Sequence, residues 1–320
     1  MTDTRKIFAA AVVGPTASGK SALAAAMAKR LGGEVVSCDS MQIYKGMDIA
    51  TAKPTCDEML GVPHHLIGCV DPSEKLSVFA YCDMAREVID DIDKRGFLAI
   101  ICGGTGLYFN SLVDNVKFPD IKGNEQLRRE LEERAENEGG ESLLSELSQF
   151  DAETAGKLSA CDTKRIVRAI EIYRSTGIPM SEHVRRSKLE PSPYDVCTIG
   201  LGYRDRQKLY DRINRRVDIM VENGLIEEAR DFLSGEYGET SAQAIGYKEL
   251  KPYFDGECSL ECALDSLKQS TRRYAKRQIS WFGRDERINR LYADDYESFE
   301  HLLDAACETV LRQMNMKKGE

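Results

Sequence analysis

The sequence has no long hydrophobic run and no cysteines at metal-ligand spacing. Its apolar stretch nearest the start, residues 7–13, is far too short to cross a bilayer and shows no signal-peptide cleavage pattern. The ten cysteines are scattered without a C-x-x-C pair, and the four histidines are not spaced around them as zinc ligands would be. These absences argue against a disulfide framework and a zinc centre. They predict a cytoplasmic protein with reduced thiols and no membrane partner.

The sequence also lacks a positive net charge. Its formal net charge is −9, which argues against a general attraction to nucleic acid. The basic residues are unevenly distributed, however, because residues 268–290 hold eight Lys or Arg and two acidic residues. These residues could therefore form a local basic face that binds nucleic acid despite the negative net charge. No coiled-coil pattern or large apolar surface is evident, so we expect a monomer.

The first third of the chain alternates short apolar runs with helical segments. We predict strands at 6–13, 34–37, 65–70 and 97–102, and helices at 19–31 and 77–95. Strands that alternate with helices form a parallel sheet, and ligands bind at the carboxyl ends of its strands. The predicted fold class is therefore α/β, with a doubly wound parallel sheet.

The alternation stops in the middle of the chain. Residues 124–186 contain helical stretches and no convincing strand, and the β-rich run 195–201 then returns to the sheet. We predict a helical insertion at 119–194 within a core formed by 1–118 and 195–312, followed by a flexible tail at 313–320. Further helices are expected at 205–221, 225–233 and 259–281, with the aromatic pair Trp281 and Phe282 in the core.

A phosphate-binding loop follows the first predicted strand. The pattern G-x-x-x-x-G-K-[ST] is matched by Gly14, Pro15, Thr16, Ala17, Ser18, Gly19, Lys20 and Ser21. Glycines let successive N–H groups face one anion, and the helix that follows adds its positive end. Lys20 would contact the outer phosphate, and the Ser21 hydroxyl would ligate Mg²⁺. The fold is therefore expected to be a P-loop α/β fold with an inserted helical domain.

A carboxylate follows the second strand, and none follows the fourth. Asp39 comes just past a strand end, where it can accept a hydrogen bond from a base amine or take its proton. A standard P-loop nucleoside triphosphatase would also need a metal-binding aspartate at the end of an apolar strand. The run 97–102 instead ends in Gly103, Gly104 and Thr105, which weakens that interpretation.

Five motifs occur in an order that resembles the tRNA dimethylallyltransferase family, also called tRNA isopentenyltransferases. They are GPTASGKS, DSMQIYKGMDIATAKP, GGTGLY, QAIGYKE and RRYAKRQISWF. The similarity runs from about residue 8 to residue 290. Two small departures are Ser21, where threonine is common, and Gly283, where arginine often follows the aromatic pair.

The resemblance implies transfer of a dimethylallyl group from dimethylallyl diphosphate to the N6 amine of adenine 37, beside the anticodon of tRNA. That amine is a poor nucleophile, so a base and a stabilised leaving group are needed. By resemblance, Asp39 is the base, Thr105 helps to place the adenine, and Arg216 reaches the same phosphates as Lys20. The amides of residues 16–21 would hold the diphosphate.

The resemblance also implies contacts with the tRNA anticodon stem-loop, whose adenine must turn out of its stack. The helical insertion is expected to take part in these contacts. The residues implied are Asp39, Ser40, Met41, Gln42, Thr105, Arg128, Lys164, Arg165, Ile166, Val167, Arg168, Gln243, Ala244, Ile245, Gly246, Tyr247 and Lys248.

Three other interpretations stay open from the residues. An isopentenyltransferase that uses free adenine nucleotides would keep the phosphate loop and Asp39, but would have little use for a helical insertion. A small-molecule kinase would use the same loop for ATP. A non-catalytic RNA-binding protein would not need an intact Lys20, Ser21 and Asp39.

Overall fold

The computed structural model describes residues 5–116, 124–187 and 189–318. The chain divides into two compact units, and each is described by itself. Unit 1 is Met1–Val113 with Pro193–Glu320, and unit 2 is Asp114–Ser192. The end of unit 2 at Ser192 lies close to residue 194, where the helical insertion was expected to end. The expected start of the insertion, residue 119, falls outside the described residues.

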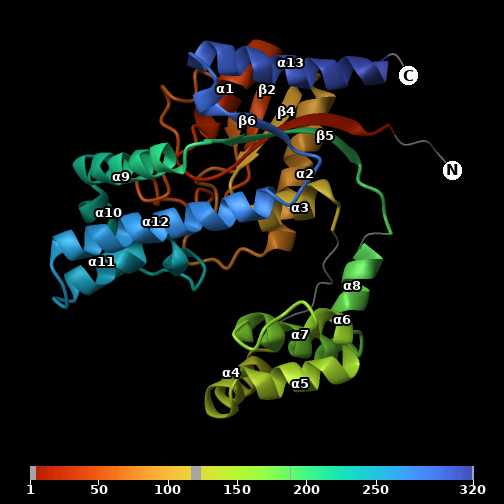
Figure 1. Ribbon diagram of the computed structural model, residues 1–320, viewed down its shortest axis with the longest axis vertical. Helices are drawn as coiled ribbons and strands as arrows, with labels where there is room; N and C mark the ends of the chain where they lie inside the picture. The colour runs from red at the N-terminus through yellow and green to blue at the C-terminus, as the bar shows by residue number, and fades with distance from the viewer. Residues whose placement is uncertain (1–4, 117–123, 188, 319–320) are drawn as a thin grey trace. The chain divides into compact units, whose positions relative to one another are not determined.

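Unit 1 is built on a six-stranded sheet whose strands are all parallel (Figure 1). The strand order is β3-β2-β4-β1-β5-β6, so the first strand of the chain lies inside the sheet. This arrangement confirms the predicted α/β fold class with a parallel sheet. The strands are β1 Ile7–Val13, β2 Gly33–Ser37, β3 His64–His65, β4 Leu98–Gly103, β5 Tyr194–Gly202 and β6 Asn289–Tyr292.

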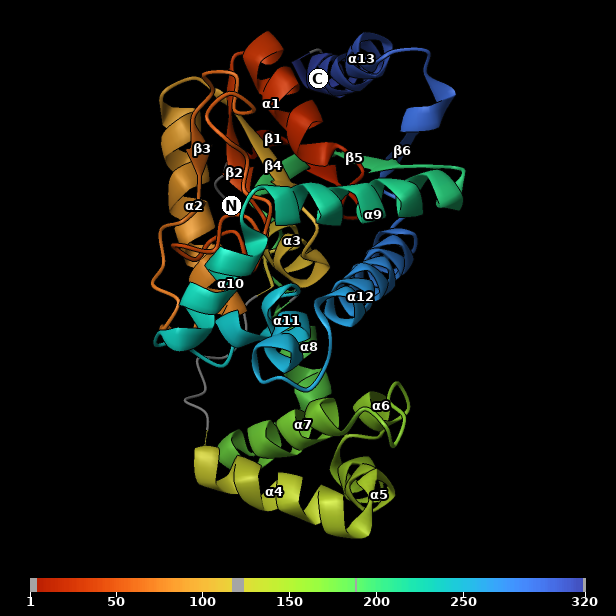
Figure 2. The same cartoon turned by 90° about the vertical axis from the view of Figure 1, so that its left-hand side faces the viewer.

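Helices cover both faces of the sheet, because successive residues of each strand point to opposite sides. In β1, Ala9 and Ala11 pack in a core with helices α2 (Val78–Lys94) and α3 (Gly106–Val113). Ala10 and Val12 pack on the other side with α1 (Lys20–Leu31) and α13 (Phe299–Lys318). Figures 1 and 2 show α1 and α13 together on this second face.

Two predicted segments of unit 1, the third strand and the C-terminal tail, differ from the observed structure. The strand expected at 65–70 is only His64–His65, because Leu66 and Gly68 adopt positive φ angles of 60° and 58°. The tail expected at 313–320 continues α13 to Lys318, and residues 319–320 lie outside the described range. The helix extends because its buried residues, including Leu303 and Val310, pack along the sheet and Met314 continues that contact.

Four helices follow β5 and lead to the site described below. They are α9 Arg206–Glu222, α10 Leu225–Ser234, α11 Tyr247–Phe254 and α12 Leu260–Phe282. At the end of α12, Phe282 is in the core as predicted and meets Phe109 edge-on. Trp281 departs from the prediction, because its residue is 42% exposed while its indole lies over Gly106.

The described part of unit 2 is helical, as the sequence predicts. Its core gathers Leu131, Leu143, Leu147 and Ile170 from three different helices, and Phe150 stacks on Tyr173 with ring centroids 3.9 Å apart. Its helices are α4 Glu125–Glu138, α5 Gly140–Phe150, α6 Ala152–Ala155, α7 Thr163–Thr176 and α8 Met180–Ser187.

Two kinds of feature are absent from the described residues. No helix there is both long and apolar enough to cross a membrane. No group of three or more His, Cys, Asp or Glu side chains is arranged there to hold a metal ion.

An ion pair between the buried Glu34 of β2 and Arg95, which follows α2, gives a pH-dependent prediction. Hydrogen bonds from Arg95, at 2.5 and 2.7 Å, lower the pKa of the buried Glu34 from 4.5 to about 2, and His65 adds a contact at 2.7 Å. Because the folded state has the lower pKa, this stabilisation is complete above the unfolded pKa and is lost as the pH falls from 4.5 towards 2. We expect Glu34→Gln to lower the free energy of unfolding by about 2–3 kcal/mol at neutral pH. The deficit should shrink across that acid range.

Urea denaturation at a series of pH values measures this difference. Asp91→Asn is the matched control, since Asp91 pairs with the same Arg95 from an exposed position. It should change stability by less than about 0.5 kcal/mol. A Glu34→Gln deficit that stays constant between pH 7 and pH 2 would contradict the assignment.

Candidate active site

The site lies where three neighbouring strands of the sheet end. The phosphate loop follows β1, Asp39 follows β2, and Thr105 follows β4. The segments after β2 and β4 stay hydrogen bonded, from Cys38 N to Cys102 O at 2.7 Å and from Thr105 N to Cys38 O at 3.3 Å. A pocket in unit 1 is lined by Lys20, Asp39 and Ser40 together with residues of α9, α11 and α12.

The phosphate loop is shaped by its glycines and by one close backbone contact. Gly14 has a φ of 147°, and a Cβ there would lie 2.2 Å from the carbonyl oxygen of Leu201 in β5. Gly19, with φ 95°, begins helix α1. The Ser18 hydroxyl is buried and has no hydrogen-bond partner within the described chain. A buried hydroxyl without a partner is costly, and an anion in the loop would satisfy it.

Not every amide of the expected set 16–21 faces this space. Thr16 N donates to the side-chain oxygen Oε1 of Gln278 at 2.8 Å, and Ser18 N donates to Pro15 O at 3.3 Å. The amides that remain available to bind an anion are those of Ala17, Gly19, Lys20 and Ser21. The last two open helix α1, whose N-terminus favours negative charge.

Two cations meet the loop from the pocket side. Lys20 and Arg216 both line the pocket, and Arg216 Nη1 donates to Thr16 Oγ1 at 3.5 Å. Burial lowers the pKa of Lys20 and that of Arg216, since little water solvates either charge. One turn before Arg216 on α9, Arg212 donates to the Ala17 carbonyl at 2.8 Å. An anion here would relieve the cost of holding two partly desolvated cations together.

Asp39 is held by its own loop. Its Oδ1 accepts hydrogen bonds from the amides of Met41 at 2.9 Å and Gln42 at 3.3 Å, which fixes the carboxylate at the strand end. The second oxygen, Oδ2, makes no hydrogen bond with any described residue. Asp39 therefore combines a fixed orientation with an oxygen that is available to a ligand in the pocket.

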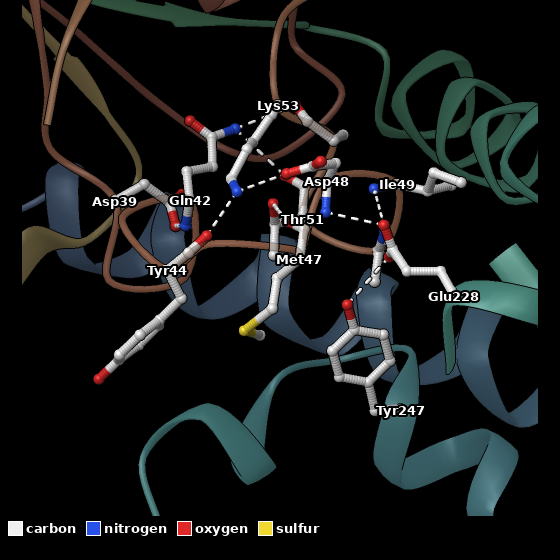
Figure 3. Close-up of polar contacts among 12 residues, drawn as sticks. Asp39, Gln42, Tyr44, Met47, Asp48, Ile49, Thr51, Lys53, Glu228 and Tyr247 are labelled. Carbon is white, nitrogen blue, oxygen red and sulfur yellow. Dashed lines mark hydrogen bonds and ion pairs between the residues drawn. The ribbon is translucent and has the colours of Figure 1, made fainter. Parts of the chain in front are cut away.

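The segment after Asp39 forms one wall of the pocket and is held by polar contacts (Figure 3). Gln42 Nε2 donates to the carbonyls of Thr51 and Ala52, at 3.1 and 3.0 Å. Lys53 Nζ bonds both Tyr44 O and Asp48 Oδ1 at 2.5 Å. These contacts close residues 42–53 into a compact loop.

A carboxylate from α10 holds the same loop from outside. Glu228 accepts from the amides of Asp48, Ile49 and Ala50 at 2.7–2.8 Å, as Figure 3 shows for the first two. The Tyr247 hydroxyl donates to Glu228 at 2.9 Å. Glu228 thus ties the loop to α11, and three backbone donors are satisfied by one side chain.

Thr105 lies behind the pocket wall. Its Oγ1 accepts from Ser40 N at 3.0 Å and donates to Ser40 Oγ at 3.3 Å. Tyr274 on α12 lines the same pocket, and burial raises the pKa of its phenol above the usual range. Thr105 therefore fixes Ser40, the residue next to Asp39.

Helices α9, α10 and α12 also supply a group of apolar side chains to the pocket. They are Ile213, Val217, Met220, Leu225 and Leu267. The pocket thus combines an anion-binding loop and a carboxylate with a hydrocarbon-lined wall.

The segment 243–248 contributes to the same pocket with one exception. Gln243, Ala244, Ile245, Gly246 and Lys248 line it. Tyr247 is fully buried and its hydroxyl is engaged by Glu228, so its side chain supports this wall from behind.

The residues expected to meet RNA in unit 2 differ in exposure. Lys164 and Arg165 are exposed on α7, whereas the side chains of Ile166 and Val167 are buried in the core of unit 2. Arg128 and Arg168 bond the buried carboxylate of Glu171, at 3.0 and 2.8 Å. This pairing aligns two partly exposed guanidinium groups from α4 and α7.

Several pocket residues were not singled out from the sequence. Thr271, Tyr274 and Gln278 lie three or four positions apart on α12, so one face of that helix lines the pocket. All three belong to, or adjoin, the motif RRYAKRQISWF, and their helical spacing was the available signal. Glu228 had no comparable signal.

Comparison with known proteins places the chain in a family. A model of the family described as IPP transferase matches residues 42–285, and one described as isopentenyl transferase matches residues 7–67. A tRNA dimethylallyltransferase of Caldanaerobacter subterraneus subsp. tengcongensis is 49% identical over 91% of this chain and 93% of its own. The chain belongs to the IPP transferase family.

Solved structures of similar proteins support this membership. The full-length tRNA isopentenylpyrophosphate transferase of Bacillus halodurans superimposes with a TM-score of 0.73 at 42% identity, covering 98% of this chain and all of that one. A eukaryotic dimethylallyltransferase acting on tRNA gives a TM-score of 0.72 at 29% identity, over 89% of this chain and 74% of that one. The family resemblance inferred from the five motifs is confirmed.

Proposed function

We propose that this IPP transferase family member transfers a dimethylallyl group from dimethylallyl diphosphate to the N6 amine of adenine 37 in tRNA. Its relatives carry the names of tRNA dimethylallyltransferases. The observation that carries the proposal is the composition of the single pocket described above. An anion-binding loop, an oriented carboxylate and an apolar wall meet within it.

The donor would bind along the phosphate loop. The amides at the start of α1, the Ser18 hydroxyl, Lys20 and Arg216 hold the diphosphate, and the five-carbon group lies against the apolar residues of α9, α10 and α12. As the C–O bond to the diphosphate breaks, negative charge accumulates on the leaving oxygens. Positively charged and N–H groups that are already in place stabilise that charge without reorganisation.

The acceptor amine would approach from the side of Asp39. A new C–N bond forms between N6 and the allylic carbon, the diphosphate leaves with the electrons of the C–O bond, and the amine loses one proton. Asp39 Oδ2 takes that proton, because Oδ1 is already engaged by two amides. Thr105 keeps Ser40 and Asp39 in place.

We further propose that Mg²⁺ assists by neutralising the diphosphate. The Ser21 hydroxyl lines the pocket at the start of α1 and would be its protein ligand. No carboxylate cage is arranged among the described residues, and Mg²⁺ with few protein ligands keeps its waters and binds substrate phosphates.

The tRNA would present its anticodon stem-loop with adenine 37 turned out of the stack. Exposed cations in both units are suited to its phosphates, among them Lys164, Arg165 and Lys248. We propose that a monomer carries out the reaction, because the pocket is complete within one chain.

The test is transfer of radiolabel from dimethylallyl diphosphate, with Mg²⁺, to unmodified tRNA, AMP or ATP in parallel. We expect label in tRNA alone, and position 37 identified by digestion and mass spectrometry. Label in AMP or ATP would instead assign a free-nucleotide acceptor. No label in any acceptor would refute the proposed transfer.

A further inference from the structure

Gln278 joins two loops of the pocket through one side-chain amide. Its Oε1 accepts from Thr16 N at 2.8 Å, and its Nε2 donates to Gly104 O at 3.0 Å. The residue is 4% exposed, and its bond to Gly104 is buried. A glutamine at this position therefore supplies one donor and one acceptor to two different backbone groups.

The two loops serve opposite halves of the proposed reaction. Thr16 belongs to the phosphate loop, and its hydroxyl accepts from Arg216. Gly104 directly precedes Thr105, which fixes Ser40 beside Asp39. A continuous series of hydrogen bonds thus runs from the diphosphate side through Gln278 to the acceptor side.

The packing between this amide and Gly104 is close. A Cβ at Gly104 would lie 2.1 Å from Gln278 Nε2, so the absence of a side chain there lets the amide reach the backbone. One turn earlier on α12, Tyr274 lines the same pocket, so one face of this helix borders the site at both positions.

We propose that Gln278 is a positioning residue that sets the distance between the phosphate loop and the Ser40–Thr105 pair. The inference rests on the proposed function, because the two halves matter only if a group passes between them. Transfer requires the allylic carbon and the amine to be aligned, and a misplacement of about 1 Å costs roughly a hundredfold in rate. Neither bond of Gln278 is needed to bind either substrate alone.

The test compares Gln278→Met and Gln278→Glu with the full-length parent chain. Methionine keeps the length and loses both bonds, whereas ionised glutamate keeps an acceptor for Thr16 N and loses the donor for Gly104 O. We expect both variants to lower the single-turnover transfer rate by roughly ten- to a hundredfold. Dissociation constants for inorganic diphosphate and for tRNA should stay within about threefold of the parent. Gln269→Met, at an exposed position on the same helix, is the matched control and should match the parent.

Amide hydrogen exchange at Thr16 adds a second measurement. Exchange should accelerate in Gln278→Met and less so in Gln278→Glu, which retains the acceptor. Parent-like transfer rates in both variants would overturn this inference and leave the proposed function intact. A fall in transfer rate that weaker binding of diphosphate or tRNA explains entirely would do the same. Absence of transfer by the parent chain would overturn the proposed function and this inference with it.

Discussion

Replacing Asp39 with asparagine is expected to slow dimethylallyl transfer by roughly a thousandfold, the middle of the range for losing a general base. Asparagine retains a side-chain oxygen to accept from Met41 N and Gln42 N, so the loop keeps its conformation. What it loses is the oxygen that takes the amine proton. Single-turnover transfer of label to tRNA measures the effect.

Binding should be little affected in this variant, because the phosphate loop and the basic residues are unchanged. The dissociation constants for diphosphate and for tRNA should therefore stay within about threefold, unlike the rate. Asp57→Asn serves as the control, since Asp57 is exposed outside the pocket. A rate for Asp39→Asn within tenfold of the parent would exclude Asp39 as the base.

Replacing Arg216 with glutamine is expected to slow transfer by about a hundred- to a thousandfold, the usual cost of removing one group that stabilises developing negative charge. Arg216 lines the pocket and bonds Thr16, so its guanidinium is aimed at the leaving group. Arg216→Lys should recover only part of the rate, because an ammonium does not offer the planar pair of donors that phosphate accepts.

The measurements for Arg216 are the single-turnover rate and the affinity for inorganic diphosphate by calorimetry, and both should fall. Arg215→Gln is the matched control, because Arg215 is the adjacent and exposed residue of the same helix. Equal losses in the two variants would point to the general charge of α9 rather than to a contact with the leaving group.

The sequence predicted those parts of the site that a single short segment contains. The phosphate loop needs only one strand end, two glycines, Lys20 and the helix that follows, all within residues 7–31. Asp39 could be placed for the same reason, directly after β2. The return to the sheet at β5 was also evident, because the run 195–201, rich in β-branched and apolar side chains, follows a helical region.

Other features depend on packing between distant segments, and the sequence pattern does not contain that information. Gln278 is one polar residue on an amphipathic helix, and its role arises only because Thr16, 262 positions away, packs against it. Glu228 likewise resembles any solvated helix carboxylate until the loop at Asp48 is folded onto it. The extension of α13 was missed because its last turns are polar in sequence and are continuous with a helix already packed on the sheet.

The strand order also constrains how the protein is made. β1 leaves the ribosome before the other strands of this sheet, yet one of its two neighbours, β5, follows the whole of unit 2. Until Gly202 has been synthesised, β1 presents an unpaired apolar edge, which is a site for mispairing with other chains. Arg216 and Gln278 come later still. A nascent or truncated chain that ends within unit 2 therefore carries an intact phosphate loop without a finished sheet or pocket, and is a target for quality control rather than a partial enzyme.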